Sequence, residues 1–170
     1  MIPERLPKSI NGLKEMIKYI DSLSPTKDLT ICEIGSWTGC SMVEFAKAFK
    51  KVICIDPFDS TGEINTLYNM KEVEAIFDKR ASQFNNVIKI KGLSENVCFQ
   101  IEDIDVLYID GLHEYSGCKR DILLYKNKIK KIICGHDYSN KFKGVIKAVN
   151  EILGIPDKTF TDTSWLKVIK

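Results

Sequence analysis

The sequence predicts an α/β protein with a doubly wound, mostly parallel sheet that helices flank on both faces. Short apolar runs such as 51–56 and 104–111 alternate with segments whose apolar residues recur every three or four positions. Continuous apolar runs are typical of strands that are buried on both faces, as in parallel sheets. Each run ends in Gly, Asp or His, and ligands bind at the carboxyl ends of such strands. The residues after the strands are therefore the candidates for function.

The elements follow in order from periodicity and from the residues that end them. A helical pattern over 8–23 ends at Ser24-Pro25, because the residue before a proline disfavours helix. We expect strands at 29–34, 51–56, 86–92, 104–111 and 131–137. We expect helices at 40–50, 66–83, 114–128 and 144–153, and a final strand or hairpin at 158–170. We therefore predict one domain of 170 residues, with an N-terminal helical segment at 1–24 and a core at 28–153.

Composition narrows the class of protein. The net charge of +2 is too small to favour nucleic acid as a partner. The basic clusters at 126–131 and 141–147 are interpreted as solvated faces. No apolar segment is long enough for a membrane span or a signal peptide, so we expect no membrane partner. Six cysteines without metal-ligand spacing favour reduced thiols and a cytoplasmic location.

The stretch 30–41, TICEIGSWTGCS, places Glu33 inside a strand and follows it with Gly35 and Gly39. A Rossmann-like dinucleotide site requires G-x-G-x-x-G, and Ser36 stands where its second glycine would approach a pyrophosphate. A ligand without phosphates but with a cationic amino group suits Glu33 better. The alternative is a tight turn between strand and helix with no ligand.

Two further strand ends extend this pattern. Asp56 ends the second strand about twenty residues after Glu33, where an acid can accept hydrogen bonds from ribose hydroxyls. It could equally cap a turn before Pro57. Ser94 and Glu95 follow the third strand as candidate partners of an adenine edge, and Ser94 could also be a helix N-cap.

Together with YIDGLHEY at 108–115 and GHDY at 135–138, these motifs resemble the class I S-adenosylmethionine-dependent methyltransferases. Over residues 28–153 the chain is most similar to small O-methyltransferases related to catechol O-methyltransferase and to sugar O-methyltransferases of antibiotic pathways. The resemblance implies S-adenosylmethionine as cofactor. It assigns the methionine end to Glu33, Gly35 and Gly39, the ribose to Asp56 and the adenine to Ser94, and it makes Ser36 and Asp110 further cofactor-binding residues.

Relatives that need a metal bind it through an Asp after the fourth strand and an Asp-Asp or Asp-Asn pair after the fifth. Here the corresponding residues are Asp110 and His136-Asp137, which the resemblance implies as ligands of a divalent cation. An imidazole in place of a carboxylate favours Mn²⁺ over Mg²⁺. The alternatives are caps at the two aspartates and a solvent-facing residue at His136.

The residue that could act as general base differs from the one in the relatives. The sugar-modifying enzymes have an acid two residues after the strand-four Asp, where this chain has Leu112. His113 comes next, and an unperturbed pKa near 6.5 suits a base at neutral pH. The alternative is a helix-start residue with a local hydrogen bond. We therefore predict that Asp110 and His113 are catalytic.

Three functions compete. The first is methyl transfer to a hydroxyl of a sugar or small metabolite, with a small-molecule acceptor that the sequence does not identify. The second is an NAD(P)-type oxidoreductase, which the missing glycine disfavours. The third is a non-catalytic cofactor-binding module, which Leu112 and His136 keep open. A homodimer through segment 8–23 is a further hypothesis.

Overall fold

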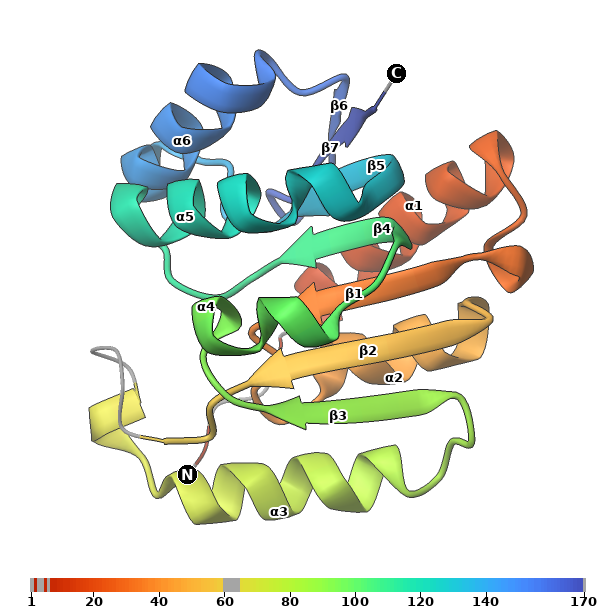
Figure 1. Cartoon of the computed structure of the whole chain (residues 1–170), viewed down its shortest axis with the longest axis vertical. Helices are drawn as coiled ribbons and strands as arrows, with labels where there is room; N and C mark the ends of the chain where they lie inside the picture. The colour runs from red at the N-terminus through yellow and green to blue at the C-terminus, as the bar shows by residue number, and fades with distance from the viewer. Residues whose placement is uncertain (1, 3–4, 6, 60–64, 170) are drawn as a thin grey trace.

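The computed structural model describes residues 2, 5, 7–59 and 65–169. It confirms the α/β fold, with a seven-stranded sheet in the order β3-β2-β1-β4-β5-β7-β6 (Figure 1). Strands β1 to β5 are parallel, β7 is antiparallel to β5, and β6 is antiparallel to β7. The strands are β1 Thr30–Ile34, β2 Lys51–Asp56, β3 Val87–Lys91, β4 Ile104–Ile109, β5 Ile129–Gly135, β6 Lys158–Thr159 and β7 Trp165–Val168.

Helices connect and cover these strands. They are α1 Pro7–Leu23, α2 Cys40–Ala48, α3 Met70–Ala81, α4 Ser94–Val97, α5 Tyr115–Tyr125 and α6 Lys143–Leu153. Helix α3 begins later than position 66 because the Asn69 side chain accepts a hydrogen bond from Lys71 N at 3.2 Å and caps it. The segment 65–67 forms a separate 3₁₀ turn. The short helix α4 was not predicted.

Each face of the sheet has its own core. Helices α1, α2 and α3 cover one face, where Leu13, Met16 and Ile20 of α1 are fully buried. Helices α4, α5 and α6 cover the other face. Burial of each large apolar side chain contributes about 1.5–3 kcal/mol relative to exposure. The prediction that helices cover both faces of the sheet is therefore confirmed, and it explains why the strands are apolar along their whole length.

The strand order places the switch point between β1 and β4. From β1 the chain winds through β2 to β3 on one side, then crosses back to β4 and β5 on the other. The connections that follow β1 and β4 leave in opposite directions, which opens a crevice at their carboxyl ends. The arrowheads of β1 to β4 point the same way, toward this edge (Figure 1).

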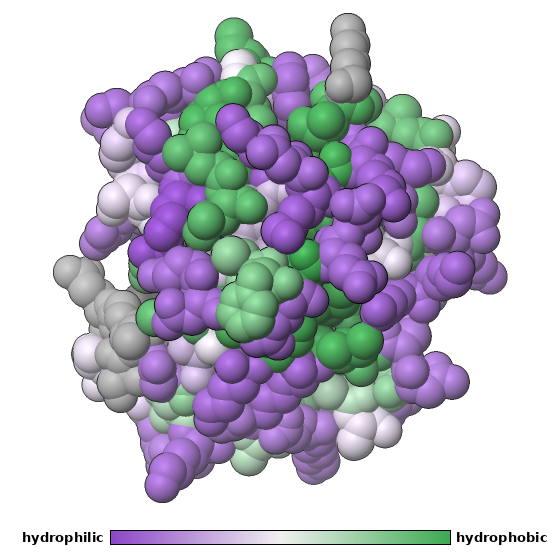
Figure 2. All heavy atoms as spheres, in the orientation of Figure 1, coloured by the Kyte–Doolittle hydropathy of each residue, from purple (hydrophilic) through white to green (hydrophobic). Residues whose placement is uncertain are grey.

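The antiparallel β6–β7 pair confirms a hairpin in the tail. Position 170, the last residue of the predicted segment, lies outside the described residues. Positions 1, 3, 4 and 6 of the predicted N-terminal segment also lie outside them. The face shown in Figure 2 is mostly hydrophilic, with separate apolar patches. Within the described ranges no helix has the length and apolar character of a membrane span. The six cysteines, all in the described part, are free thiols.

Candidate active site

Gly35 lets the end of β1 lie directly against the end of β4. Its φ is +87°, in the left-handed region that favours glycine. A Cβ at this position would overlap the backbone carbonyl of Asp110. Backbone hydrogen bonds of 2.9 Å from Gly35 N to Ile55 O and 2.8 Å from Asp110 N to Ile34 O fix the contact. Gly39, also left-handed with φ +81°, is the N-cap of α2. The predicted strand-to-helix turn is therefore present at the switch point.

The buried carboxylate of Glu33 stabilises this turn through hydrogen bonds. Its side chain is fully buried, and one carboxylate oxygen accepts a hydrogen bond from the Ser41 hydroxyl in the first turn of α2. The other oxygen accepts from Cys54 Sγ at 3.6 Å. Burial raises the pKa of Glu33 to about 7, although the Ser41 hydroxyl acts in the opposite direction. Glu33 thus orients the loop, while its predicted contact with the cofactor stays a prediction.

Stability should fall as the pH rises through the range in which Glu33 ionises. Between its ordinary pKa of 4.5 and the folded value of about 7, the folded chain keeps a proton that the unfolded chain releases. The stabilisation is therefore fully present below pH 4.5 and is lost toward pH 7, with a total on the order of 3 kcal/mol. Glu33→Gln should flatten this decline in urea unfolding measured from pH 4.5 to 7.5. Asp103→Asn, at an exposed acid, should leave it unchanged; equal slopes in both variants would contradict the assignment.

Asp56 clamps two loops together. Its Oδ2 accepts a hydrogen bond from Trp37 N at 2.9 Å, and its Oδ1 accepts one from Phe58 N at 2.8 Å. Burial raises the pKa of Asp56, and these backbone N–H groups act against the rise. The bond to Phe58 is the turn cap that the sequence offered as the alternative. A carboxylate oxygen has more than one acceptor site, so the ribose role stays a prediction.

Ser94 does not cap a helix. The N-cap of α4 is Leu93, and the Ser94 hydroxyl donates to Asp121 Oδ1 at 2.5 Å. Tyr125 Oη donates to the Ser94 carbonyl at 2.9 Å, so the start of α4 is fixed from α5. Burial raises the pKa of Asp121 to about 6. The N-cap alternative is therefore wrong, and an adenine contact by Ser94 stays a prediction.

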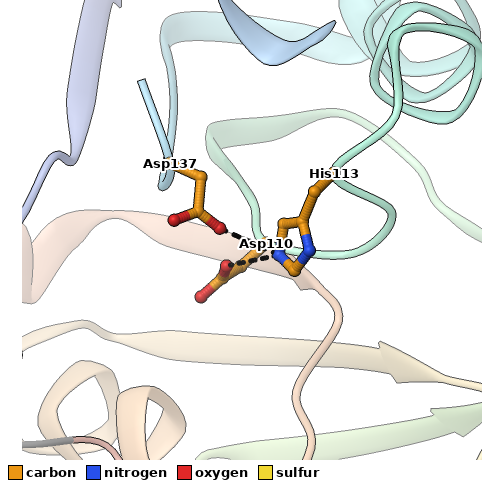
Figure 3. Close-up of side chains that lie close together, drawn as sticks. All are labelled: Asp110, His113 and Asp137. Carbon is orange, nitrogen blue, oxygen red and sulfur yellow. Dashed lines mark ion pairs between the residues drawn. The ribbon is translucent and has the colours of Figure 1, made fainter. Parts of the chain in front are cut away.

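Asp110, His113 and Asp137 point toward one another beyond the ends of β4 and β5 (Figure 3). Each of the three offers one ligand atom, and these atoms all lie within 4.8 Å of one another. His113 Nε2 lies 2.9 Å from Asp137 Oδ2 and 3.9 Å from Asp110 Oδ1. The sequence predicted both aspartates as ligands and His113 as a base, and the structure brings all three together.

His136, the third predicted ligand, also faces the two aspartates. Its Nδ1 is 3.1 Å from Asp137 Oδ1 and 3.8 Å from Asp110 Oδ1. The left-handed backbone of Asp137, with φ +62°, turns the chain sharply after His136. The side chain of His136 is 16% exposed, which excludes the solvent-facing alternative. Both imidazoles therefore face the same pair of carboxylates.

The charges of this cluster shift its pKa values. Burial alone would raise the pKa of Asp137, but hydrogen bonds from His113 and His136 hold it well below its usual range. Burial alone would lower the pKa of His113, but Asp110 and Asp137 raise it to about 10. The pKa near 6.5 expected for His113 is therefore wrong for the ligand-free chain, in which this side chain is an imidazolium at neutral pH. It can accept a proton only after the charge of the aspartates is neutralised.

Arg5 is a site residue that the sequence did not reveal. Its guanidinium donates to an Asp110 carboxylate oxygen, and Nη1 donates to Tyr108 Oη at 3.2 Å. The Arg5 side chain is 13% exposed and that of Asp110 is 11% exposed. Arg5 thus compensates the charge of Asp110 from a segment that precedes α1. A lone Arg in the stretch MIPERLPKS carried no signal of this long-range contact.

The residues present fit the groups that the resemblance implies. Two carboxylates and an imidazole match the donors of a divalent transition ion. Ser36 Oγ is buried and makes no hydrogen bond of standard geometry in the part of the chain that the structure describes, although it lies near enough to Glu33 to lower the pKa of that carboxyl group. This hydroxyl beside the glycine turn can therefore contact a polar ligand. The glycine turn and Asp110 adjoin at the end of β4, where Gly35 packs against the Asp110 backbone.

Comparison with known proteins places the chain in a family. Residues 32–138 match a family described as a methyltransferase domain. An uncharacterised protein of Acanthamoeba polyphaga mimivirus is 34% identical over 138 residues, which are 74% of this chain and 60% of that protein. The chain thus spans less than two thirds of this relative.

Solved structures share the fold. An O-methyltransferase from Bacillus cereus in complex with SAH has a TM-score of 0.64 at 16% identity, over 99% of this chain and 84% of that one. TomG, an O-methyltransferase from Streptomyces achromogenes in complex with SAM, has a TM-score of 0.65 at 11% identity, over 99% and 82%. The calicheamicin methyltransferase CalS11 has a TM-score of 0.66 at 14% identity, over 96% and 80%. The chain therefore belongs to the methyltransferase-domain family and has the fold of the class I S-adenosylmethionine-dependent O-methyltransferases.

Proposed function

We propose that the protein is an S-adenosylmethionine-dependent methyltransferase that methylates a hydroxyl of a sugar or small metabolite with the help of a divalent cation. The observation that carries this proposal is the group of Asp110, His113 and Asp137 beside the glycine turn. The family supports methyl transfer, and the two carboxylates, which His136 Nδ1 also faces, support a cation at the acceptor.

Methyl transfer from a sulfonium is an in-line displacement, in which the acceptor oxygen bonds the methyl carbon as the carbon–sulfur bond breaks. The chain supplies alignment and charge for this step. A divalent ion held by Asp110 and Asp137 would lower the pKa of the acceptor hydroxyl and fix its position. His113 is the proposed acceptor of the hydroxyl proton, since its Nε2 lies at the two aspartates. Neutralising these carboxylates would return its pKa to a useful range.

Calorimetric titration separates the proposal from its alternatives. We expect S-adenosylmethionine and S-adenosylhomocysteine to bind and NAD⁺ not to bind, because Ser36 replaces the glycine that a pyrophosphate needs. Turnover is followed as release of S-adenosylhomocysteine with catechols and nucleotide sugars as acceptors and Mn²⁺ or Mg²⁺ added. Binding of NAD⁺ alone would overturn the proposal. Binding of S-adenosylmethionine without turnover on any acceptor would favour the non-catalytic module.

Arg5 should compete with a cation for Asp110. In Arg5→Gln the internal counter-charge of Asp110 is removed, so we expect Mn²⁺ to bind roughly tenfold more tightly, a gain of about 1.4 kcal/mol. The measurement is calorimetric titration of the cofactor-free chain with MnCl₂. Arg120→Gln is the matched control, since Arg120 pairs with Glu95 at 2.9 Å and touches neither Asp110 nor Asp137. Weaker Mn²⁺ binding in Arg5→Gln would show that Arg5 supports the site rather than opposing a cation.

A further inference from the structure

Helix α5 places a buried carboxylate beside the start of α4. Asp121 is 2% exposed, and its Oδ1 accepts the hydrogen bond from the Ser94 hydroxyl at 2.5 Å. Its other oxygen, Oδ2, lies toward Gly111, where a Cβ would be 3.7 Å from it. Ser94 follows β3 and Gly111 follows β4. Asp121 therefore contacts the loops after both strands at the edge of the sheet where the crevice opens.

The chain itself satisfies this carboxylate only in part. Within the described residues, the Ser94 hydroxyl is the one hydrogen-bond donor to Asp121, and it binds Oδ1. The positive charge beside it, at Arg120 Nε, lies 4.0 Å from the same oxygen. Burial outweighs both contacts, since the pKa of Asp121 is still raised to about 6. Oδ2 is thus a buried acceptor that receives no hydrogen bond from the described chain, an arrangement that costs stability.

This acceptor lies on the side of the crevice that the resemblance assigns to adenine. Ser94 is the residue assigned to the base, and Asp56 is the residue assigned to the ribose. Gly92 N donates to the Asp56 carbonyl at 3.1 Å, so the loop that leads to Ser94 is fixed to the end of β2. A nucleoside whose ribose binds Asp56 would direct its base toward Ser94 and Asp121. The exocyclic amino group of adenine is a donor, and an ionised carboxylate only accepts.

We infer that Asp121 determines the base specificity of the cofactor site, because its Oδ2 accepts a hydrogen bond from the 6-amino group of adenine. The inference rests on the proposed function and deepens it, since it names the group that recognises the adenine of S-adenosylmethionine. The Ser94 hydroxyl orients the carboxylate by binding Oδ1, which leaves Oδ2 for the base. Glu95, the other acid that the sequence offered for the adenine edge, pairs instead with Arg120 at 2.9 Å.

S-Inosylhomocysteine tests the inference on the unaltered chain. It carries a carbonyl oxygen where S-adenosylhomocysteine has the 6-amino group, so two acceptors would face each other at Asp121 Oδ2. We expect it to bind about 10–100-fold more weakly than S-adenosylhomocysteine, the range for loss of a hydrogen bond to a charged group. Calorimetric titration with each ligand at pH 7.5, where Asp121 is ionised, gives the ratio of the two dissociation constants. Equal affinities would overturn the inference.

Asp121→Leu identifies the residue responsible. Leucine has the branched shape of aspartate without its oxygens, and the Ser94 hydroxyl keeps an acceptor in Glu95 Oε2 at 3.3 Å. Because burial of the carboxylate is unfavourable, we expect the urea midpoint at pH 7.5 not to fall. The affinity for S-adenosylhomocysteine should fall about 10–100-fold and that for S-inosylhomocysteine should not fall, so that the discrimination disappears. Equal losses for both ligands, with the ratio kept, would reduce Asp121 to a structural role.

Glu95→Met is the matched control. It removes the neighbouring acid, whose side chain is 30% exposed, and the ratio of the two dissociation constants should stay as in the wild type. Loss of discrimination in Glu95→Met but not in Asp121→Leu would mean that α4 rather than α5 recognises the amino group, and the inference would be wrong.

The same titrations distinguish failure of the proposed function from failure of this inference. If the wild-type chain binds neither S-adenosylhomocysteine nor S-inosylhomocysteine, the proposed function fails and the inference fails with it. If the wild-type chain binds both with equal affinity, cofactor binding stands and only the recognition of the base by Asp121 is overturned.

Discussion

Asp137→Asn is expected to lose both cation binding and methyl transfer. The carboxylate of Asp137 lies between the two imidazoles, 2.9 Å from His113 Nε2 and 3.1 Å from His136 Nδ1. Removal of its charge takes away a ligand, so we expect Mn²⁺ affinity to fall by at least about 100-fold, the upper end of the loss seen for outer partners alone. Turnover with Mn²⁺ should fall in parallel. Calorimetry and release of S-adenosylhomocysteine measure the two effects.

Asp137→Asn is expected to leave the fold intact. Asp137 has φ +62°, and asparagine tolerates the left-handed region as well as aspartate does. Asp103→Asn removes an equal charge at a 67% exposed side chain and should leave both measurements unchanged. Full turnover in Asp137→Asn would remove the cation from the mechanism.

Gly35→Ala is expected to be the most destabilising single change at the proposed cofactor site. The left-handed backbone costs an alanine about 1–2 kcal/mol, and the new Cβ would also overlap the Asp110 carbonyl. Displacement of either strand end would open the crevice between β1 and β4. We therefore expect a loss of unfolding free energy above about 2 kcal/mol and no measurable binding of S-adenosylmethionine.

Gly154→Ala separates the two causes. Gly154 has φ +77° and ψ −172°, a conformation that is also unfavourable for alanine, but a Cβ there would meet no atom within 4 Å. Urea unfolding of this control should show a backbone cost without an overlap, with cofactor binding intact. If Gly154→Ala also abolished binding of S-adenosylmethionine, the contact of Gly35 with Asp110 would not be the cause of the loss.

Most of the fold could be predicted from the sequence because both periodicities are strong. The buried strands read as continuous apolar runs, and helices such as α1 bury one stripe. Helix α4 was missed because its four residues are too few to show a helical period. The beginning of α3 was misplaced because the cap at Asn69 acts within a polar stretch where periodicity is weak.

Only those residues of the candidate site that directly follow a strand could be predicted from the sequence. Asp110 and Asp137 follow neighbouring parallel strands, so the topology alone brings them together. The pKa of His113 depends on distances to two carboxylates, which no sequence pattern contains. Arg5 and Asp162 reach the site across 105 and 26 positions of sequence respectively, and contacts of this kind leave no local signal.

The partners of the acidic cluster come from outside the stretch that defines the family. Residues 32–138 contain the glycine turn and both aspartates, whereas Arg5, which pairs with Asp110, and Asp162, which lies 3.8 Å from His136 Nε2, flank this stretch. A fragment trimmed to the matched residues would keep the motifs but would lose β7, which pairs with β5 from Ile132 to Gly135. The bare edge of β5 would then be open to pairing with other chains. Trimming a clone to the motif boundaries would therefore yield an aggregating fragment with every signature residue in place.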